Sequence, residues 1–356
     1  RVSQRARDAR PRLWAYQAAR EPRRLVDDAR SSSLTHPAAP AEVVVVGSVN
    51  VDLVAQVTDL PLPGQTVLAT SYAEFPGGKG GNQAIAAARL GRRVAFVGRT
   101  GDDAAGTWVR SVLAGEHVDV AELKSLAGEA TGRAMVIVDA RAENSIVVIG
   151  GANAALRVEH VDGAAGPLQD AAVVVAQLEV PVEAVRAAAR HARGTFVFNP
   201  APAQRLDDEL MRLVDVLVVN EGEFETLTGH PVGNDLAALT ARLRDSALPR
   251  SVVVTLGGRG ALVCRDGEMV TVPAPTVSVV DTTGAGDTFV GALADALARG
   301  EELPAAARWA VCAASLSTGS LGATTAMPTS PEVRELMAKM TSDLGQGKMA
   351  ESKAPP

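Results

Sequence analysis

The chain has 356 residues, 47% of them hydrophobic, and a formal net charge of −6. A chain of this size can bury most of its surface in one large domain or two smaller ones, and it contains no apolar run near the roughly 18 residues of a membrane span. The negative charge and the small number of aromatic residues (three Trp, two Tyr and six Phe) argue against nucleic acid as the main partner. We therefore expect a globular protein that holds small ligands at local sites.

The two ends of the chain differ in composition from the rest. Residues 1–30 contain nine arginines and four acids, and a Ser-rich and Pro-rich stretch follows them up to Pro40. We expect residues 1–41 to be a disordered extension; an organelle-targeting peptide is the alternative, which the acids disfavour. Residues 339–356 are polar and end in two prolines, so we expect a disordered tail there. The folded part is then 42–338.

Between these ends, short Val-rich segments alternate with longer amphipathic segments rich in Ala, Leu and Arg. Such alternation is typical of an α/β fold with a mainly parallel sheet and helices on both faces. The pattern predicts strands at 43–47, 94–97, 173–178, 195–198, 215–219 and 252–256, and helices at 82–90, 104–115, 181–192, 235–246, 287–299 and 304–318.

Two segments, 51–75 and 131–150, do not follow this alternation. They show the period-two, β-branched pattern of strands, as in Arg133-Ala-Met-Val-Ile-Val-Asp139, without helices between the strands. They predict a small separate β-sheet, placed where it could act as a lid over a site.

Cysteine and histidine usage excludes some kinds of site. Cys264 and Cys312 lie in apolar segments, which favours reduced core thiols and a cytoplasmic location. The five histidines are scattered, and none stands at a metal-ligand spacing from another His or Cys, which disfavours zinc.

Polar residues directly after the predicted strands are the candidate site, because ligands of open α/β sheets bind beyond the carboxyl ends of the strands. After the first strand the chain reads Gly47-Ser-Val-Asn50-Val-Asp52. In an extended chain Asn50 and Asp52 point the same way. An amide and a carboxylate so placed suit a polyhydroxylated ligand, and a turn that satisfies its own backbone is the alternative.

A glycine-rich segment follows at Gly77-Gly-Lys-Gly-Gly-Asn82. Four glycines around Lys79 let the backbone approach a ligand, and Lys79 and Asn82 supply hydrogen-bond donors. The segment is not a Walker A loop, because Gly80 stands where that motif has Ser or Thr after the lysine. A structural turn with a solvated lysine is the alternative.

Three further strand ends carry candidate residues. Glu179 follows the strand at 173–178, and Asn220-Glu-Gly-Glu223 follows the strand at 215–219. Carboxylates and amides in these places suggest metal or phosphate coordination. Thr255-Leu-Gly-Gly-Arg-Gly260 opens from a strand into glycines, which suits a nucleotide lying against backbone.

The segment Asp281-Thr-Thr-Gly-Ala-Gly-Asp287 runs into an apolar helical pattern. Small residues at 284–286 let backbone N–H groups at the helix N-terminus converge on an anion. Asp287 then lies at the edge of this anion hole, where it can take a proton from an alcohol. An isolated Gly-x-Gly-Asp also occurs in ordinary turns.

Two long motifs, Gly77–Gly101 and Asp281–Ala294, resemble the two signatures of the PfkB-type sugar kinases. The shorter segments GSVNVD at 47–52, GGKGGNQA at 77–84, NPAPA at 199–203 and NEGE at 220–223 are most similar to the ribokinase group of that family. The resemblance covers about residues 42–338, and it implies an α/β fold of the ribokinase type with a β-sheet lid.

The resemblance also implies roles for the matching positions. Asp287 acts as base, beside an anion hole of Gly284, Ala285 and Gly286. The sugar is held by Asn50, Val51, Asp52, Gly78, Lys79, Gly80, Gly81, Asn82, Glu179 and Asp287; the nucleotide by Asn220, Thr255, Leu256, Gly257, Gly258, Arg259, Gly260, Gly286 and Val311. Glu223 organises Mg²⁺ through water, and an activating K⁺ lies at Asp281, Thr283, Ser317, Ser320, Gly322 and Ala326. Val311 and Ala326 depart from the polar residues often found at their positions.

The activity implied is ATP-dependent phosphorylation of D-ribose at its 5-hydroxyl, by an enzyme that dimerises through its lid. Two alternatives remain at this stage. The first alternative is a kinase of 2-deoxyribose, fructose or a nucleoside with the same fold; Ala134 and Ile146 of the lid are candidates for setting the size of the sugar ring. The second alternative is a sugar-binding module without catalysis. The intact Gly284–Asp287 segment and Lys79 disfavour this second alternative.

Overall fold

The structure is a computed structural model that describes residues 39–141, 143–233, 239–240, 243 and 248–351. The predicted extension lies outside the described residues up to position 38, as does most of the helix predicted at 235–246. The described residues from Pro40 onward belong to one unit of the chain.

A central sheet of ten strands has the order β14-β13-β12-β11-β10-β9-β1-β4-β5, with β6 pairing with β4. Its strands pair parallel except for the antiparallel pairs β12–β13 and β13–β14. This confirms the predicted α/β fold with a mainly parallel sheet. The strands are β1 (Val43–Val46), β4 (Val94–Gly101), β5 (Val118–Asp119), β6 (Leu123–Leu126), β9 (Val173–Gln177), β10 (Thr195–Asn199), β11 (Val216–Asn220), β12 (Ser251–Thr255), β13 (Ala261–Arg265) and β14 (Glu268–Val272).

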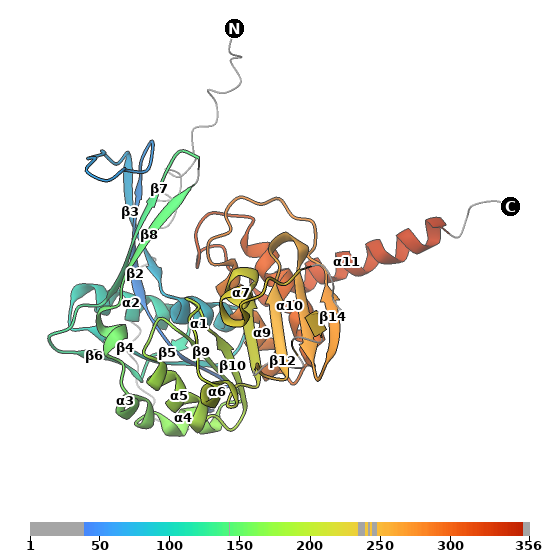
Figure 1. Ribbon diagram of the computed structural model, residues 1–356, viewed down its shortest axis with the longest axis horizontal. Coiled ribbons are helices and arrows are strands. Elements are labelled where there is room, and N and C mark those ends of the chain that lie inside the picture. The colour runs from blue at the N-terminus through green and yellow to red at the C-terminus, as the bar shows by residue number, and fades with distance from the viewer. Residues whose placement is uncertain (1–38, 142, 234–238, 241–242, 244–247, 352–356) are drawn as a thin grey trace, which may run out of the picture. The chain divides into compact units, whose positions relative to one another are not determined.

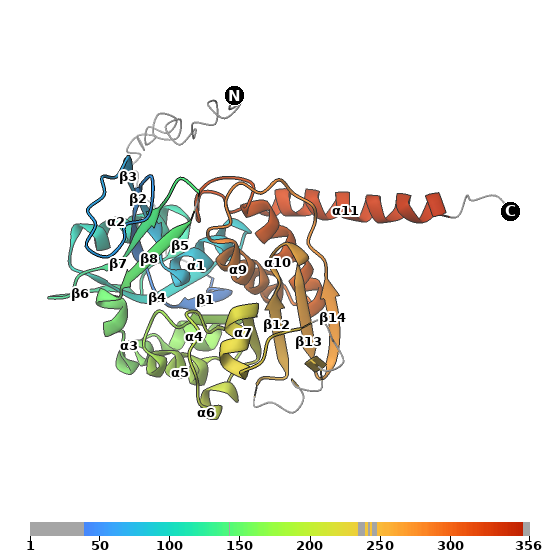
Figure 2. The ribbon, with the colours of Figure 1, turned by 45° about the horizontal axis from the view of Figure 1, so that its top comes forward.

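Helices cover both faces of this sheet, which explains the Val-rich strands. Val43 and Val45 belong to one hydrophobic cluster, whereas Val44 and Val46 belong to a second cluster on the opposite face. A strand buried on both faces reads as a continuous apolar run. The first cluster contains residues of α1 (Lys79–Arg89), α2 (Ala104–Gly115), α9 (Ala285–Ala298) and α10 (Leu303–Ser317); the second contains residues of α3 (Val158–Asp162), α4 (Ala165–Asp170), α5 (Val182–His191), α6 (Asp208–Met211) and α7 (Glu221–Thr228) (Figure 2).

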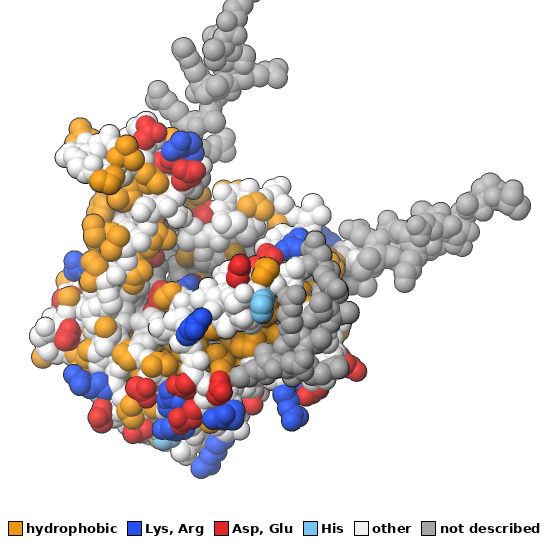
Figure 3. All heavy atoms as spheres, in the orientation of Figure 1, with side chains coloured by type: hydrophobic (Ala, Val, Ile, Leu, Met, Phe, Trp, Pro, Cys, Tyr) orange, Lys and Arg blue, Asp and Glu red, His pale blue; other side chains and the backbone are white. Residues whose placement is uncertain are grey.

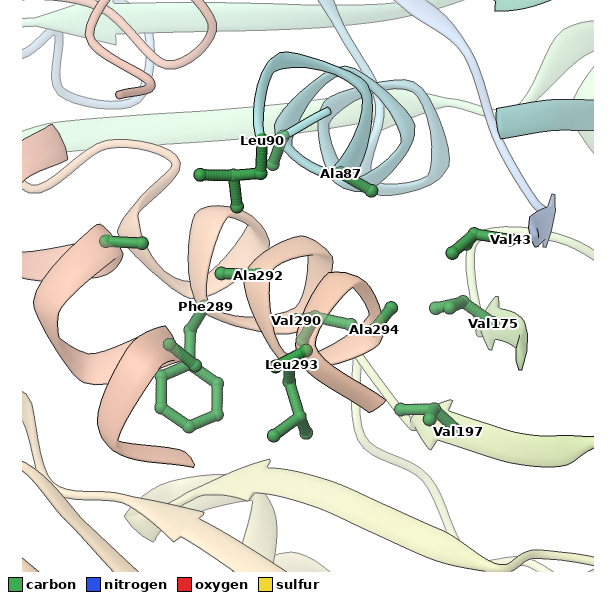
Figure 4. Close-up of a cluster of buried hydrophobic side chains, with 14 of the residues drawn as sticks. Val43, Ala87, Leu90, Val175, Val197, Phe289, Val290, Ala292, Leu293 and Ala294 are labelled. Carbon is green, nitrogen blue, oxygen red and sulfur yellow. The ribbon is translucent and has the colours of Figure 1, made fainter. Parts of the chain in front are cut away.

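Helix α9 lies in the middle of the first cluster, between α1, α10 and the sheet. Val290 and Ala294 point toward the strand residues Val175 and Val197 (Figure 4). A Cβ atom at Gly291 would lie 2.5 Å from the carbonyl oxygen of Gln83, so α1 and α9 approach each other closely. This contact brings the first turn of α9 beside the first turn of α1.

The two segments that break the alternation form a separate four-stranded sheet of order β3-β2-β7-β8, which we call the lid (Figure 1). Strands β2 and β7 pair parallel, and the other pairs are antiparallel. Apolar side chains gather along this sheet at the surface (Figure 3), and β8 is exposed over its whole length. The strands are β2 (Asn50–Gln56), β3 (Ser71–Gly77), β7 (Gly132–Val138) and β8 (Asn144–Ile149).

Some elements were not predicted from the sequence. They include the hairpin of β13 and β14 and the short helices of the second cluster. Helix α11 (Ser330–Glu351) runs into the segment for which we expected a disordered tail. Its Glu, Leu, Met, Ala and Lys residues are strong helix formers, and no proline follows Pro331 within the helix. Among the described residues, no helix combines the length and the apolar character needed to cross a membrane.

Candidate active site

The candidate site begins where the strand order reverses. Strand β1 lies between β4 and β9. The chain therefore adds β4 on one side of β1 and later adds β9 on the other side. Ligands of open α/β sheets bind at such a point, beyond the carboxyl ends of the strands. Here Ser48, which follows β1, donates its hydroxyl to Glu179, which follows β9, at 2.6 Å. The backbone N–H of Lys79 donates to the same carboxylate oxygen at 3.0 Å. Three segments that are distant in sequence therefore meet at Glu179.

Asp287 lies in the first turn of α9, behind the N-cap residue Gly284, whose φ is 76°. A left-handed backbone there favours glycine, and a Cβ atom would also lie 2.8 Å from Ala323. At Gly286 an added Cβ would meet none of the described residues within 4 Å, so the space beside this helix end is open. A helix N-terminus that opens onto free space is suited to bind an anion.

The Asp287 carboxylate is buried, at 8% exposure, and two side-chain amides hold it. Asn82 donates to Oδ2 at 2.9 Å and Gln83 donates to Oδ1 at 3.0 Å. Burial raises the pKa of Asp287 above its usual value, while the positive charge of Lys79 and the two amide donors act in the opposite direction. A buried carboxyl group with a raised pKa is a candidate general base.

Asn50 and Asp52 open the lid strand β2 and point the same way, as predicted. Asn50 is 2% exposed, and its Oδ1 accepts a hydrogen bond from Asn153 at 2.8 Å. Burial, with a smaller effect from the nearby carboxylates of Glu179 and Asp287, raises the pKa of Asp52 to about 7. The intervening Val51 packs in the first hydrophobic cluster, so its side chain does not accompany the other two.

Two buried acceptor oxygens in this group lack a partner. Oδ1 of Asp52 and Oδ1 of Asn82 have no hydrogen bond to any described residue. Buried polar atoms are nearly always satisfied in folded proteins, so unsatisfied acceptors side by side with buried donors call for a ligand. A molecule with several hydroxyl groups supplies the missing donors.

The glycine-rich segment lets the backbone of α1 pass close to β1 and β2. Gly78 has φ 85°, and a Cβ atom at Gly80 would lie 2.7 Å from the backbone nitrogen of Ser48. At Gly81 the nearest atom to an added Cβ is a side-chain carbon of Val49, at 3.3 Å. Burial lowers the pKa of Lys79, but attraction by the surrounding carboxylates outweighs it and leaves the pKa above its usual value. Lys79 therefore carries its positive charge inside the site.

The candidate nucleotide residues lie at the ends of the neighbouring strands β11 and β12, where Asn220 pairs with Thr255. Leu256 donates its N–H to the carbonyl of Gly260 at 2.8 Å, which closes a tight turn. Gly257 and Gly260 have φ values of 56° and 97° and so need to be glycine. Of the remaining candidates, Gly258 is exposed, Arg259 pairs with Glu221, and Val311 is buried at 4% exposure in the first hydrophobic cluster.

Glu223, the third residue of α7, forms a reciprocal cap with Asn220. Its carboxylate accepts the N–H of Asn220 at 2.8 Å, and Oδ1 of Asn220 accepts the N–H of Glu223 at 2.8 Å. Burial raises the pKa of Glu223, and the positive charge of Lys79 opposes this rise. An acid near both Lys79 and Asp287 is suited to bind a divalent cation indirectly, through water ligands.

The candidate monovalent-cation residues lie in the loop before α9 and in the segment from the end of α10 onward, which Asp281 ties together. Its Oδ1 accepts from the backbone and hydroxyl of Thr283, and its Oδ2 accepts from the N–H of Gly322 at 2.9 Å. The hydroxyl of Ser317 donates to Ala314, Ser320 is exposed, and Ala326 presents only a methyl group. Backbone carbonyls are then the main oxygen ligands that these segments can offer. In the described part of the chain, no three or more His, Cys, Asp or Glu residues are grouped so that they could hold a metal ion.

Five buried polar residues complete the site but were not predicted as part of it: Ser48, Gln83, Asn153, Gln177 and Asn199. Each contacts a predicted site residue or another member of this set. Gln177 and Asn199 end β9 and β10, so the rule of inspecting strand ends could have found them. Ile146, a candidate for setting ring size, is 53% exposed on β8.

A cavity of about 350 Å³ adjoins Glu179. Apolar residues line most of it, from the lid strand β8, from the segment after β9 and from Pro202. Glu179 thus faces both the group of polar residues and an open cavity.

Comparison with known proteins agrees with this geometry. The model of the pfkB family of carbohydrate kinases matches residues 40–330. A ribokinase of Haemophilus influenzae is 37% identical over 300 residues, which covers 83% of this chain and 98% of the relative. A deoxyribokinase of Salmonella typhi is 35% identical over 304 residues, covering 83% and 99%. The solved structure of Arabidopsis thaliana ribokinase complexed with ribose and ATP matches with a TM-score of 0.78 at 32% identity, covering 84% of this chain and 99% of that one.

The family match spans both the central sheet and the lid, and the relatives are covered almost completely. The chain therefore belongs to the pfkB family of carbohydrate kinases and is a sugar kinase of the ribokinase type.

Proposed function

We propose that the protein transfers the γ-phosphoryl group of ATP to the 5-hydroxyl of D-ribose, giving ribose 5-phosphate and ADP. The observation that carries this proposal is the buried Asp287, held by Asn82 and Gln83 beside the open N-terminus of α9. For an alcohol to attack a phosphoryl group, an enzyme needs a base for the alcohol and a site for the phosphoryl anion, and these two groups provide them.

The sugar is bound by donors and acceptors of both the lid and the central sheet. Asp52 and Asn82 accept hydrogen bonds from sugar hydroxyls through the two oxygens that lack partners, and Lys79 donates. Asn50 and Glu179 complete the ring of polar groups around the sugar. Free hydroxyls at carbons 2 and 3 satisfy the Asn50 and Asp52 pair, which favours ribose over 2-deoxyribose.

The reaction step belongs to Asp287. It accepts the proton of the 5-hydroxyl as the oxygen attacks, while the N–H groups at 284–286 stabilise the negative charge on the phosphoryl oxygens. ATP supplies the phosphoryl group when bound, and its nucleotide lies against the glycines that follow β12. Glu223 would hold a Mg²⁺ ion through its water ligands, and the charge of that ion would neutralise the phosphates.

The two segments tied together by Asp281 would hold an activating K⁺ through backbone carbonyl oxygens. Such an ion would stabilise the first turn of α9, and Ala326 would contribute its carbonyl in place of a hydroxyl ligand.

The lid pairs with the lid of a second copy to form a homodimer, in the cytoplasm. The exposed strand β8 carries Ile146, Val147, Val148 and Ile149, each at least 46% exposed, and such an edge favours pairing. Both cysteines are buried thiols that form no disulfide, as expected in a reducing compartment.

ADP release with ribose, 2-deoxyribose, fructose and adenosine, each with and without K⁺, tests the proposal. We expect turnover with ribose to exceed turnover with the other acceptors at least tenfold and to rise with K⁺. A preference for 2-deoxyribose, as the Salmonella relative's name suggests, would transfer the assignment to that sugar. Absence of turnover with every acceptor would refute the kinase reaction.

A further inference from the structure

We infer that Gln83 is a positioning residue for the catalytic base, and that a relay of three buried amides, Gln177, Gln83 and Asn199, fixes its orientation. This inference rests on the proposed role of Asp287. The relay crosses the carboxyl ends of three adjacent strands and ends on the carboxylate that takes the proton.

The contacts form one continuous chain. Nε2 of Gln177 donates to Oε1 of Gln83 at 2.6 Å. Nε2 of Gln83 donates both to Oδ1 of Asp287 at 3.0 Å and to Oδ1 of Asn199 at 3.2 Å. Nδ2 of Asn199 donates to the backbone carbonyl of Val218, in β11, at 2.9 Å.

The direction of these bonds is set by the backbone. The carbonyl of Val218 only accepts, so the NH₂ group of Asn199 must face it and the oxygen of Asn199 must face Gln83. Gln83 must then turn its own NH₂ group toward Asn199 and Asp287. An isolated glutamine could present either its oxygen or its nitrogen to a carboxylate. Within the relay only the nitrogen can face Asp287.

Burial makes this arrangement rigid. Gln83 and Gln177 are 0% exposed and Asn199 is 7% exposed. A Cβ atom at Gly47 would lie 2.1 Å from Oε1 of Gln177, so a glycine follows β1 where Gln177 needs room. Buried amide networks hold their members in one geometry where their hydrogen bonds are made, and in this relay only Oε1 of Gln177 has no partner among the described residues.

Charged groups also face Asp287 from several elements: Lys79 of α1, Glu179 after β9, Asp52 of the lid and Glu223 of α7. Lys79 stabilises the carboxylate, whereas the three acids destabilise it. The relay adds a neutral donor on the side of Asp287 that faces the sheet, so its effect can be separated from these charges by uncharged substitutions.

The test is the pH dependence of kcat at saturating ribose and MgATP in Gln83→Met and Gln83→Glu. Methionine is the uncharged substitution: it keeps the length of the side chain and removes the donor. Glutamate keeps the shape but presents an acceptor and adds a negative charge. We expect the acid limb of the profile to move to higher pH by about one unit with methionine, and further with glutamate. The affinity for ribose should change less than threefold.

Two further variants keep the test decisive. Gln177→Met cuts the relay one residue away from Gln83, and we expect a smaller shift in the same direction. Asp295→Asn is the matched control. It changes a buried carboxylate on the same helix, eight residues or roughly 12 Å beyond Asp287, where it pairs with Arg92 and Arg299. It should lower thermal stability and leave the acid limb in place.

An acid limb that stays in place in both Gln83 variants, while wild type turns over, would overturn the inference and leave the kinase assignment intact. A shift of the limb in Asp295→Asn as large as in Gln83→Met would overturn it too, since a general loosening of α9 would then explain both. A wild-type protein without turnover would instead refute the proposed function.

Discussion

Asn153 holds Asn50 across 103 positions of the sequence, its amide donating to Oδ1 of Asn50 at 2.8 Å. The same Asn153 also accepts from the N–H of Val49 and donates to its carbonyl, both at 3.0 Å. Asn153 follows the last lid strand and Asn50 begins the first. The pair therefore fastens the two ends of the lid segment together at the sugar site.

Asn153→Ala should weaken sugar binding more than it slows the reaction. The oxygen of Asn50 would lose its buried donor, so its NH₂ group would no longer be held toward the sugar. We expect KM for ribose to rise about fivefold, since one hydrogen bond contributes about 1 kcal/mol, with kcat within threefold of wild type. Steady-state kinetics measure both. Asn144→Ala, at the exposed end of β8, is the control and should change neither value.

Asp287→Asn should remove most turnover while the sugar still binds. An amide cannot accept the hydroxyl proton, and a positioned base contributes about 10²–10⁴-fold in rate. We expect kcat to fall within that range and the dissociation constant for ribose, measured by calorimetry, to stay within a few-fold. Turnover near that of wild type would show that another group acts as base.

Ribose binding should weaken as the pH falls below about 7. The pKa of Asp52 in the sugar-free site is about 7, because of burial and the nearby Glu179 and Asp287. Below that pH the carboxyl is protonated and no longer accepts with both oxygens. We expect the dissociation constant to rise up to tenfold per pH unit below pH 7 and to be level above it. Asp52→Asn should abolish this dependence, whereas Asp59→Asn, on an exposed part of the lid, should retain it.

The same carboxyl should make the sugar-free protein less stable at alkaline pH. Its pKa is about 7 in the folded state and 3.8 for an exposed aspartate, so the folded state binds the proton more tightly. Its contribution to stability is complete below pH 4 and is lost as the pH rises to 7. Asp52→Asn should therefore raise the free energy of unfolding by up to about 4 kcal/mol at pH 8 and have little effect at pH 4. Urea unfolding at both pH values, without ribose, measures this difference.

The predictable part of the fold is the part that is buried on both faces. All six predicted strands are present, because two-sided burial leaves a Val-rich run in the sequence. The hairpin of β13 and β14 was missed although Asp266 and Gly267 form its turn, with φ values of 50° and 81°. An Asp-Gly pair with left-handed residues is a typical hairpin signal. The hairpin therefore carries a local signal in the sequence although it does not show the two-sided burial of the central strands.

Site residues that belong to a sequence motif could be predicted. Site residues whose role depends on a contact formed only in the tertiary structure could not. Lys79, Asn82 and Asp287 lie in glycine-rich segments that are visible in the sequence. The contact between Gln83 and Asp287 joins residues 204 positions apart, and the contact between Gln177 and Gln83 joins residues 94 apart. No local pattern indicates which buried amide faces which, because that depends on how α1, α9 and the strands pack.

The glycines around the sugar site limit how its specificity can change. A Cβ atom at Gly77 would lie 2.2 Å from Asp52, and one at Gly132 would lie 2.2 Å from Asn153. At these positions even a single methyl group would displace a polar side chain, so stepwise evolution or engineering of a new acceptor has no small change available there. The accessible route is Ala134, the neighbour of Asp52 on β7, where a residue with a side chain can be exchanged for another.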